Sequence, residues 1–243
     1  MISKANIQLV KSLQDKKQRQ KYNQFVVEGE KSITELLKSP FTVLKLYAVS
    51  EFLTQYAQLL KNVSFEEVND KELKQMSAHM APQKAIAVVK MPDESSIPST
   101  VKLILALDEI QDPGNLGTII RIADWYGIEH IVCSRGCTDV YNPKCINSTM
   151  GSFLRVKVHY QDIIQVAEQT KLPIMVAVLE GQNIHKGNLP KEGVLVIGNE
   201  GHGVHPTIIA KAKHKLSIPS YGGAESLNAA ISTAIILDNL IQA

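Results

Sequence analysis

The sequence predicts an α/β protein of two domains, and three observations support this fold class. Short apolar segments alternate with helical segments through residues 1–90, which is typical of an α/β layer. A stretch rich in proline and serine, MPDESSIPST at 91–100, then interrupts the alternation and is the best candidate for a linker. Beyond it, VKLILALDEI at 101–110 is a continuous apolar run, typical of a parallel strand covered on both faces.

The individual elements follow from apolar periodicity and from turn residues between them. In the first domain, at 1–92, we expect strands at 25–29, 42–50 and 85–90, and helices at 29–39, 50–60 and 71–79. In the second, at 101–243, we expect strands at 101–110, 128–134, 154–160, 173–181 and 193–201. Its helices are expected at 115–127, 162–170, 205–214 and in the apolar C-terminal segment, with a loop leading into a short helix at 142–153. Residues 93–100 remain as the linker.

Composition narrows the class of protein. The chain has 243 residues and 44% hydrophobic content, enough for a folded core, and no apolar run approaches the roughly 18 residues of a membrane span. The N-terminal segment is too polar for a signal peptide, so we expect a cytoplasmic protein. Cys133, Cys137 and Cys145 lack the paired spacing of a zinc site, which favours reduced thiols and no metal.

Positive charge is concentrated near the N-terminus, although the net charge is only +2. A basic cluster of this kind either contacts phosphates or is a solvated helix face, and the sequence alone leaves both interpretations open. Its members are Lys11, Lys16, Lys17, Arg19 and Lys21.

Two segments of the second domain carry polar residues beside strands. In DPGNLGTIIRIAD at 112–124, Asn115 is a possible helix cap and Arg121 lies six residues later, so helical spacing alone does not put them on one face. In VLVIGNEGHGV at 194–204, three glycines follow an apolar strand, where backbone amides can approach a ligand. The spacing matches neither the dinucleotide fingerprint nor a P-loop, which argues against a Rossmann-type dehydrogenase.

The C-terminal segment SIPSYGGAESLNAAISTA at 217–234 has more polar side chains than one helix cap requires. Glu225, Ser226 and Asn228 precede an apolar helix and follow the Gly222–Gly223 pair. The helix itself is apolar around most of its circumference, so we expect it to be buried on two sides, one of them in a dimer interface.

The order of these three segments resembles the successive motifs of the SpoU/TrmH branch of the SPOUT RNA methyltransferases, over about residues 101–243. Residues 1–92 resemble, more loosely, the L30e-like RNA-binding domain of ribosomal RNA 2′-O-methyltransferases. The resemblance implies a parallel sheet with a deep trefoil knot near the C-terminus, a homodimer, RNA as substrate and S-adenosylmethionine as cofactor. It also implies that Gly222 and Gly223 form the turn at which the chain passes through the knot.

The resemblance also implies residue roles. It implies that Arg121 is the essential arginine, which we interpret as a clamp on the phosphate and ribose because a guanidinium is effectively never deprotonated. The other positions that match catalytic residues of the family are Asn115, Glu200, Ser226 and Asn228. The positions that match its cofactor-binding residues are Leu179, Gly198, Asn199, Gly201, Ile218, Pro219 and Leu227.

Two departures and two alternatives remain open at this point. Asn147 stands where many family members carry an arginine, and Ala229 and Ala230 replace the more usual Val-Ser. A tRNA 2′-O-methyltransferase is the first alternative, although family tRNA enzymes usually lack an L30e-like domain. A non-catalytic RNA-binding assembly factor is the second, and the intact catalytic positions argue against it. The target nucleotide is not specified by the sequence.

Overall fold

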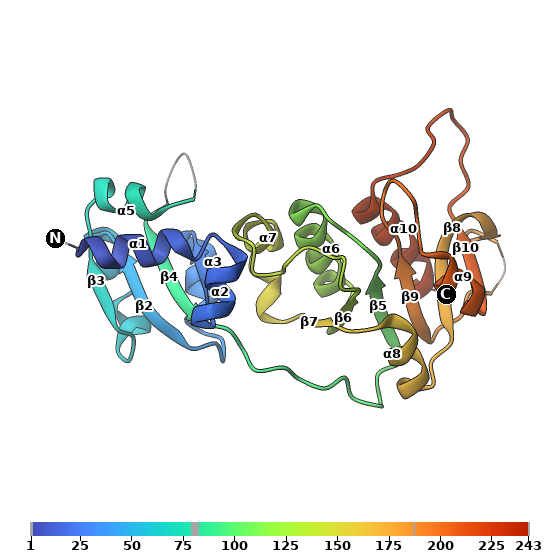
Figure 1. Cartoon of the computed structure of the whole chain (residues 1–243), viewed down its shortest axis with the longest axis horizontal. Helices are drawn as coiled ribbons and strands as arrows, with labels where there is room; N and C mark the ends of the chain where they lie inside the picture. The colour runs from blue at the N-terminus through green and yellow to red at the C-terminus, as the bar shows by residue number, and fades with distance from the viewer. Residues whose placement is uncertain (1, 79–82, 187, 243) are drawn as a thin grey trace. The chain divides into compact units, whose positions relative to one another are not determined.

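The computed structural model describes residues 2–78, 83–186 and 188–242 and divides the chain into two compact units. Unit 1 comprises residues 1–93 together with Tyr141–Leu154, and unit 2 comprises Glu94–Val140 and Arg155–Ala243. Between them, residues 91–98 form neither helix nor strand (Figure 1). Tyr141–Leu154 therefore joins unit 1 although it lies within the range 101–243 that the sequence assigns to the second domain.

Unit 1 is built on a four-stranded sheet of order β1-β4-β2-β3, in which β4 is antiparallel to both neighbours and β3 is parallel to β2. The strands are β1 (Gln24–Glu28), β2 (Val43–Ala48), β3 (Phe65–Glu67) and β4 (Ala85–Lys90). The helices are α1 (Lys4–Ser12), α2 (Lys16–Tyr22), α3 (Glu30–Leu36), α4 (Ser50–Gln55), η1 (Ala57–Leu60), α5 (Asp70–Met76), α7 (Pro143–Thr149) and η2 (Ser152–Leu154).

The alternation of side chains along β1 and β4 gives unit 1 an apolar layer on each face of the sheet. Phe25 and Val27 face one layer, which includes residues of α3, α4, η1, α7 and η2. Val26 faces the other, which includes residues of α1 and α5. Phe153 of η2 lies with its ring centroid 6.1 Å from that of Phe25, which explains why Tyr141–Leu154 belongs to this unit.

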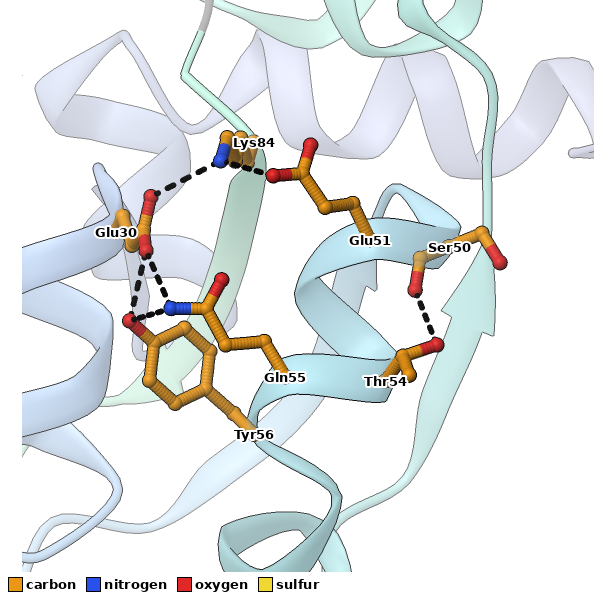
Figure 2. Close-up of polar contacts among 7 residues, drawn as sticks. All are labelled: Glu30, Ser50, Glu51, Thr54, Gln55, Tyr56 and Lys84. Atoms are coloured by element: carbon orange, nitrogen blue, oxygen red, sulfur yellow. Dashed lines mark hydrogen bonds and ion pairs between the residues drawn. The ribbon is translucent and has the colours of Figure 1, made fainter.

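A polar cluster ties the start of α3 to α4 and to the residue preceding β4 (Figure 2). Glu30 accepts hydrogen bonds from the Tyr56 hydroxyl at 2.7 Å and from Gln55 Nε2 at 3.4 Å. Lys84 Nζ lies 2.6 Å from Glu51 and 3.7 Å from Glu30. The hydrogen bond to the Glu30 carboxylate raises the pKa of Tyr56. Because exposed ion pairs contribute little stability, the cluster mainly fixes the relative position of these elements.

Arg19 corrects the expectation of a basic cluster of five exposed residues. Its side chain is buried, and its NH1 group donates to the carbonyl oxygens of Leu13 at 2.9 Å and Gln14 at 2.7 Å. This arginine therefore connects α2 to the end of α1 and is not available to a phosphate. The exposed members of the cluster, hereafter the α1–α2 lysines, are Lys11, Lys16, Lys17 and Lys21.

Unit 2 contains a six-stranded, all-parallel sheet of order β10-β8-β9-β5-β6-β7, as the apolar strands predict (Figure 1). The strands are β5 (Leu103–Leu107), β6 (His130–Cys133), β7 (Lys157–Tyr160), β8 (Ile174–Asn183), β9 (Gly193–Ile197) and β10 (His214–Ser217). The helices are α6 (Pro113–Trp125), α8 (Ile163–Thr170), α9 (Pro206–Lys211) and α10 (Ala229–Gln242).

The helices of unit 2 lie on both faces of the sheet. α8 and α9 pack on the face formed by Ile104, Ala106 and Val196, whereas α6 packs with α10. The chain therefore leaves the neighbouring strands β5 and β9 toward opposite faces. In a parallel sheet, the carboxyl ends of two such strands form a crevice where ligands bind.

Several elements differ from the sequence prediction, among them α1 and α2, which were not predicted. β3 and β10 were not predicted, because they have only three and four residues and include charged side chains. The helix predicted at 50–60 is two shorter ones, α4 and η1, because Tyr56 leaves helical geometry at φ −111° and ψ 21°. The helix predicted at 71–79 begins one residue earlier, at Asp70, and ends earlier, at Met76, because Ser77 is extended; His79 lies outside the described residues.

Candidate active site

The loop that follows β5 positions the first group of predicted residues. Asp112 is the N-cap of α6, and its Oδ1 accepts the backbone N–H of Asn115 at 2.9 Å. Pro113 occupies the first turn, where its missing N–H is not needed. The cap is therefore Asp112 and not Asn115, which leaves the Asn115 side chain free to project from the first turn.

Asn115 joins all three sequence motifs through its amide. Its Oδ1 accepts from Asn228 Nδ2 at 2.9 Å, and its Nδ2 donates to Glu200 Oε1. Asn228 is at the same time the cap of α10, because its Oδ1 accepts the backbone N–H groups of Ala230 at 2.9 Å and Ile231 at 3.4 Å. Three of the five predicted catalytic residues therefore form one chain of hydrogen bonds, hereafter the Asn228–Asn115–Glu200 relay.

Arg121 and Ser226, the other two predicted catalytic residues, are not part of this relay. Both side chains are exposed, and neither makes a hydrogen bond or ion pair with any of the described residues. For Arg121 this agrees with helical geometry, since six residues do not return it to the face of Asn115. Its guanidinium is an uncompensated cation on the same helix that carries Asn115.

The loop that follows β9 is held rigidly against the loop that follows β5. Asn199 Nδ2 donates to the carbonyl oxygen of Glu109 at 2.9 Å, and Asn199 Oδ1 accepts from the Gly201 N–H at 2.8 Å. Asn199 and Gly203 also exchange backbone hydrogen bonds at 3.2 and 2.9 Å. A Cβ atom at Gly198 would lie 2.2 Å from the carbonyl carbon of Gly203, so only glycine fits there. These contacts fix the backbone around Glu200, so that its side chain can reach Asn115.

The predicted cofactor-binding residues lie in three parts of unit 2: Leu179 within β8, residues 198–201 directly after β9, and Ile218, Pro219 and Leu227 between β10 and α10. Leu179 is 76% exposed and Leu227 is 45% exposed, whereas Ile218 and Pro219 are partly buried. Ser217 Oγ donates to the Leu179 carbonyl oxygen at 2.7 Å, which ties β10 to β8. Leu179 and Leu227 therefore offer uncovered apolar surface of the kind that a flat heterocycle, such as the adenine of S-adenosylmethionine, requires.

Sequence reasoning missed several supporting residues. Glu109 adopts a left-handed conformation at φ 55°, and its carboxylate lies 3.2 Å from His202 Nε2. Asp108 is buried, and its Oδ2 accepts the His205 N–H at 2.8 Å. An aspartate directly before a proline indicates a helix N-cap, so the sequence could have identified Asp112 as the cap. No local pattern marks Asp108 or Glu109.

Within the described residues, no group of three or more His, Cys, Asp or Glu side chains is placed to hold a metal ion. Cys133, Cys137 and Cys145 are buried thiols that are not joined in disulfides. A hydrogen bond with Cys133 lowers the pKa of Cys137. Over the same described part of the chain, no helix is long and apolar enough to cross a membrane.

Comparison with known proteins gives matches to both parts of the chain. Residues 102–238 match the SpoU rRNA Methylase family, and residues 4–87 match the MRM3-like substrate binding domain. The 23S rRNA (guanosine(2553)-2'-O)-methyltransferase RlmP of Bacillus subtilis is 32% identical over 95% of this chain and 93% of its own length.

Solved structures agree over the whole chain. A putative RNA methyltransferase of the TrmH family from Porphyromonas gingivalis has a TM-score of 0.89 at 33% identity, covering 99% of this chain and 98% of its own. An AdoMet-bound rRNA methyltransferase from Sinorhizobium meliloti has a TM-score of 0.88 at 25% identity, covering 100% of this chain and 97% of its own.

Proposed function

Because the chain belongs to the SpoU rRNA Methylase family, we propose that it transfers a methyl group from S-adenosylmethionine to a ribose 2′-hydroxyl of ribosomal RNA. The observation that carries the proposal is the Asn228–Asn115–Glu200 relay, which joins one residue from each of three distant motifs at the carboxyl edge of the sheet. We assign RNA of the 23S type, since the Bacillus subtilis relative that matches nearly the whole chain is named for that substrate. This assignment also favours a cytoplasmic location.

The relay prepares Glu200 to accept a hydrogen bond from the substrate. Its Oε1 already accepts from Asn115, and among the described residues no donor reaches Oε2. A ribose hydroxyl is a weak nucleophile, so a carboxylate oxygen that accepts its hydrogen bond increases the electron density on the attacking oxygen. When bound, S-adenosylmethionine supplies an electrophilic methyl group.

Arg121 contributes charge and positioning. A guanidinium presents donors in a planar fork that matches a phosphate, and it stays protonated. We assign it to the phosphate next to the reacting ribose, where it holds the 2′-oxygen in place and stabilises negative charge that develops there. Ser226, which is exposed and follows the two glycines of its loop, is assigned to the same substrate surface.

We also propose that the active form is a knotted homodimer. Ile231 and Ile241 on α10 are 52% and 47% exposed, and Trp125 on α6 is 85% exposed. α6 and α10 pack on each other, and large apolar side chains are costly to leave in water. A second copy of the chain would cover them, and light scattering at micromolar concentration measures whether it does.

Unit 1 is assigned to substrate RNA. It carries the match to the MRM3-like substrate binding domain, and its α1–α2 lysines provide exposed positive charge for phosphates. Asn147, which lies in α7 of this unit, lacks the charge of the arginine that is usual there.

Methyl transfer from labelled S-adenosylmethionine to in vitro transcribed 23S rRNA, 16S rRNA and tRNA tests the proposed function. We expect transfer to 23S rRNA, near-complete loss of turnover in Arg121→Ala, and almost as large a loss in Arg121→Lys, since a point charge does not reproduce a bidentate contact. Cofactor affinity measured by calorimetry should stay within a few-fold in both variants. Transfer to tRNA alone would refute the substrate, and wild-type turnover in Arg121→Lys would refute the clamp.

A further inference from the structure

Unit 2 has a second cleft at the carboxyl edge of its sheet, on the face covered by α8 and α9. Its volume is about 710 Å³, within the range of sites that hold small ligands. The loops after β5, β6 and β7 line it, together with α8 and α9. None of the residues assigned above to catalysis or to the cofactor lines this cleft.

The acidic groups around the cleft are already engaged with other parts of the protein. Asp108 accepts the backbone N–H of His205, and Glu109 is paired with His202. Asp162 caps α8, where its Oδ1 accepts the Gln165 N–H at 2.9 Å. These carboxylates therefore hold the walls of the cleft in place.

The groups that remain available are one arginine and three glutamines. Arg135, Gln161, Gln165 and Gln169 are exposed, and their side chains make no hydrogen bond or ion pair with any described residue. Gln165 and Gln169 lie four residues apart on α8 and so project from the same face. Carboxamides offer both a donor and an acceptor, which is the pairing needed to read the edge of a nucleobase.

Tyr160 adds a rigid aromatic surface to the same cleft. Its hydroxyl donates to the Thr138 carbonyl oxygen at 2.6 Å and accepts the Val140 N–H at 2.8 Å, which fixes the ring from its polar end. The residue is nevertheless 39% exposed, so part of the ring is open to a ligand. Unpaired bases of RNA stack on tyrosine rings of this kind.

We infer that this cleft binds one unpaired nucleotide of the RNA substrate, with its base stacked on Tyr160, its edge against the glutamines and its phosphate on Arg135. The inference rests on the proposed function, because it takes RNA to be the substrate of the chain. A nucleotide matches the three features together: an aromatic face, neutral paired donors and acceptors, and a single free cation. The cleft thus selects RNA that presents an unpaired nucleotide to this face of unit 2.

The test uses the full-length protein and fluorescein-labelled hexanucleotides rA6, rC6 and rU6, with binding measured by fluorescence anisotropy. The triple variant Arg135→Ala/Gln165→Ala/Gln169→Ala removes exposed side chains that make no described contact. We expect its dissociation constant to rise on the order of tenfold for at least one hexanucleotide. The matched control, Lys157→Ala/Glu168→Ala, removes an exposed cation on β7 and an exposed α8 side chain outside the cleft, and should change it less than twofold.

Three results would overturn the inference. The first is equal binding by the triple variant and the wild type, and the second is no binding of any hexanucleotide by the wild type. The third is a loss of S-adenosylmethionine affinity in the triple variant, which would assign the cleft to the cofactor. The proposed function is judged separately by methyl transfer to 23S rRNA. If the wild type transfers no methyl group but the triple variant still loses hexanucleotide binding, the proposed function fails and the cleft stands.

Discussion

Asn228 has two separable roles, and two substitutions distinguish them. Its Oδ1 caps α10 and its Nδ2 donates to Asn115. Asn228→Ala removes both contacts, whereas Asn228→Asp keeps an oxygen for the cap and removes only the donor. Aspartate is as good a cap as asparagine, and its charge suits the positive end of a helix.

The expected stabilities follow from the cap. Losing it in Asn228→Ala should lower the free energy of unfolding by about 1 kcal/mol. In a unit of this size that corresponds to a lower melting temperature by roughly 2–4 °C, whereas Asn228→Asp should melt like the wild type. Differential scanning calorimetry measures both.

The expected activities follow from the relay. In Asn228→Asp a carboxylate oxygen faces Asn115 Oδ1, and turning the Asn115 amide over only moves the clash to Glu200, because that residue is also an acceptor. Both variants should therefore lose methyl transfer by roughly five- to tenfold, the cost of about one hydrogen bond between neutral amides. Wild-type turnover in Asn228→Asp would refute the reasoning, and so would a melting temperature as low as that of Asn228→Ala.

Three further predictions concern other parts of the chain. Burial lowers the pKa of His130 and His159, whose Nδ1 and Nε2 atoms lie 3.0 Å apart, so the free energy of unfolding should be constant above about pH 6.5 and decrease as the pH falls below it. Urea titration of the wild type and His159→Gln measures this decrease, and an equal decrease in both proteins would contradict the prediction. Gly198→Ala should abolish cofactor binding in calorimetry. Gly201→Ala, whose Cβ would lie 3.3 Å from Asn199 Oδ1, should still bind the cofactor, and equal affinities of the two variants would contradict the need for glycine at 198. Charge reversal of the α1–α2 lysines, with the buried Arg19 left intact, should reduce the slope of log binding constant for RNA against log salt concentration by roughly 0.7 to 0.9 per lost phosphate contact. An unchanged slope would mean that these lysines are only a solvated helix face.

The sequence was sufficient for the fold class because the signals involved are local. The apolar strands of unit 2 and the α6 helix, which ends before Gly127 at φ 70°, are specified by their own residues. The order of the three motifs, through its resemblance to a family, was sufficient to name Asn115, Glu200 and Asn228 as candidate catalytic residues. Their contact was not predictable from local pattern, because Asn115 and Asn228 are 113 positions apart and meet only when β5 and α10 are placed by the sheet.

Other features depend on tertiary packing that composition does not record. Arg19 has the same charge as its neighbours but is buried, because the carbonyl oxygens at the end of α1 converge on it. The segment containing Phe153 packs in unit 1, although it lies between strands of unit 2. The second cleft draws its lining from loops after three strands and from two helices, so no single motif marks it.

The central claim is methyl transfer to a ribose 2′-hydroxyl of ribosomal RNA, and a comparison of RNA from cells with and without this gene tests it most directly. Mass spectrometry of nuclease digests locates each 2′-O-methylated nucleotide in 23S rRNA, 16S rRNA and tRNA. We predict that deletion removes a 2′-O-methyl group from 23S rRNA, and that the wild-type gene restores it while Arg121→Lys does not. An unchanged pattern of 2′-O-methylation in 23S rRNA, or the loss of a methyl group from a base instead of a ribose, would contradict the account.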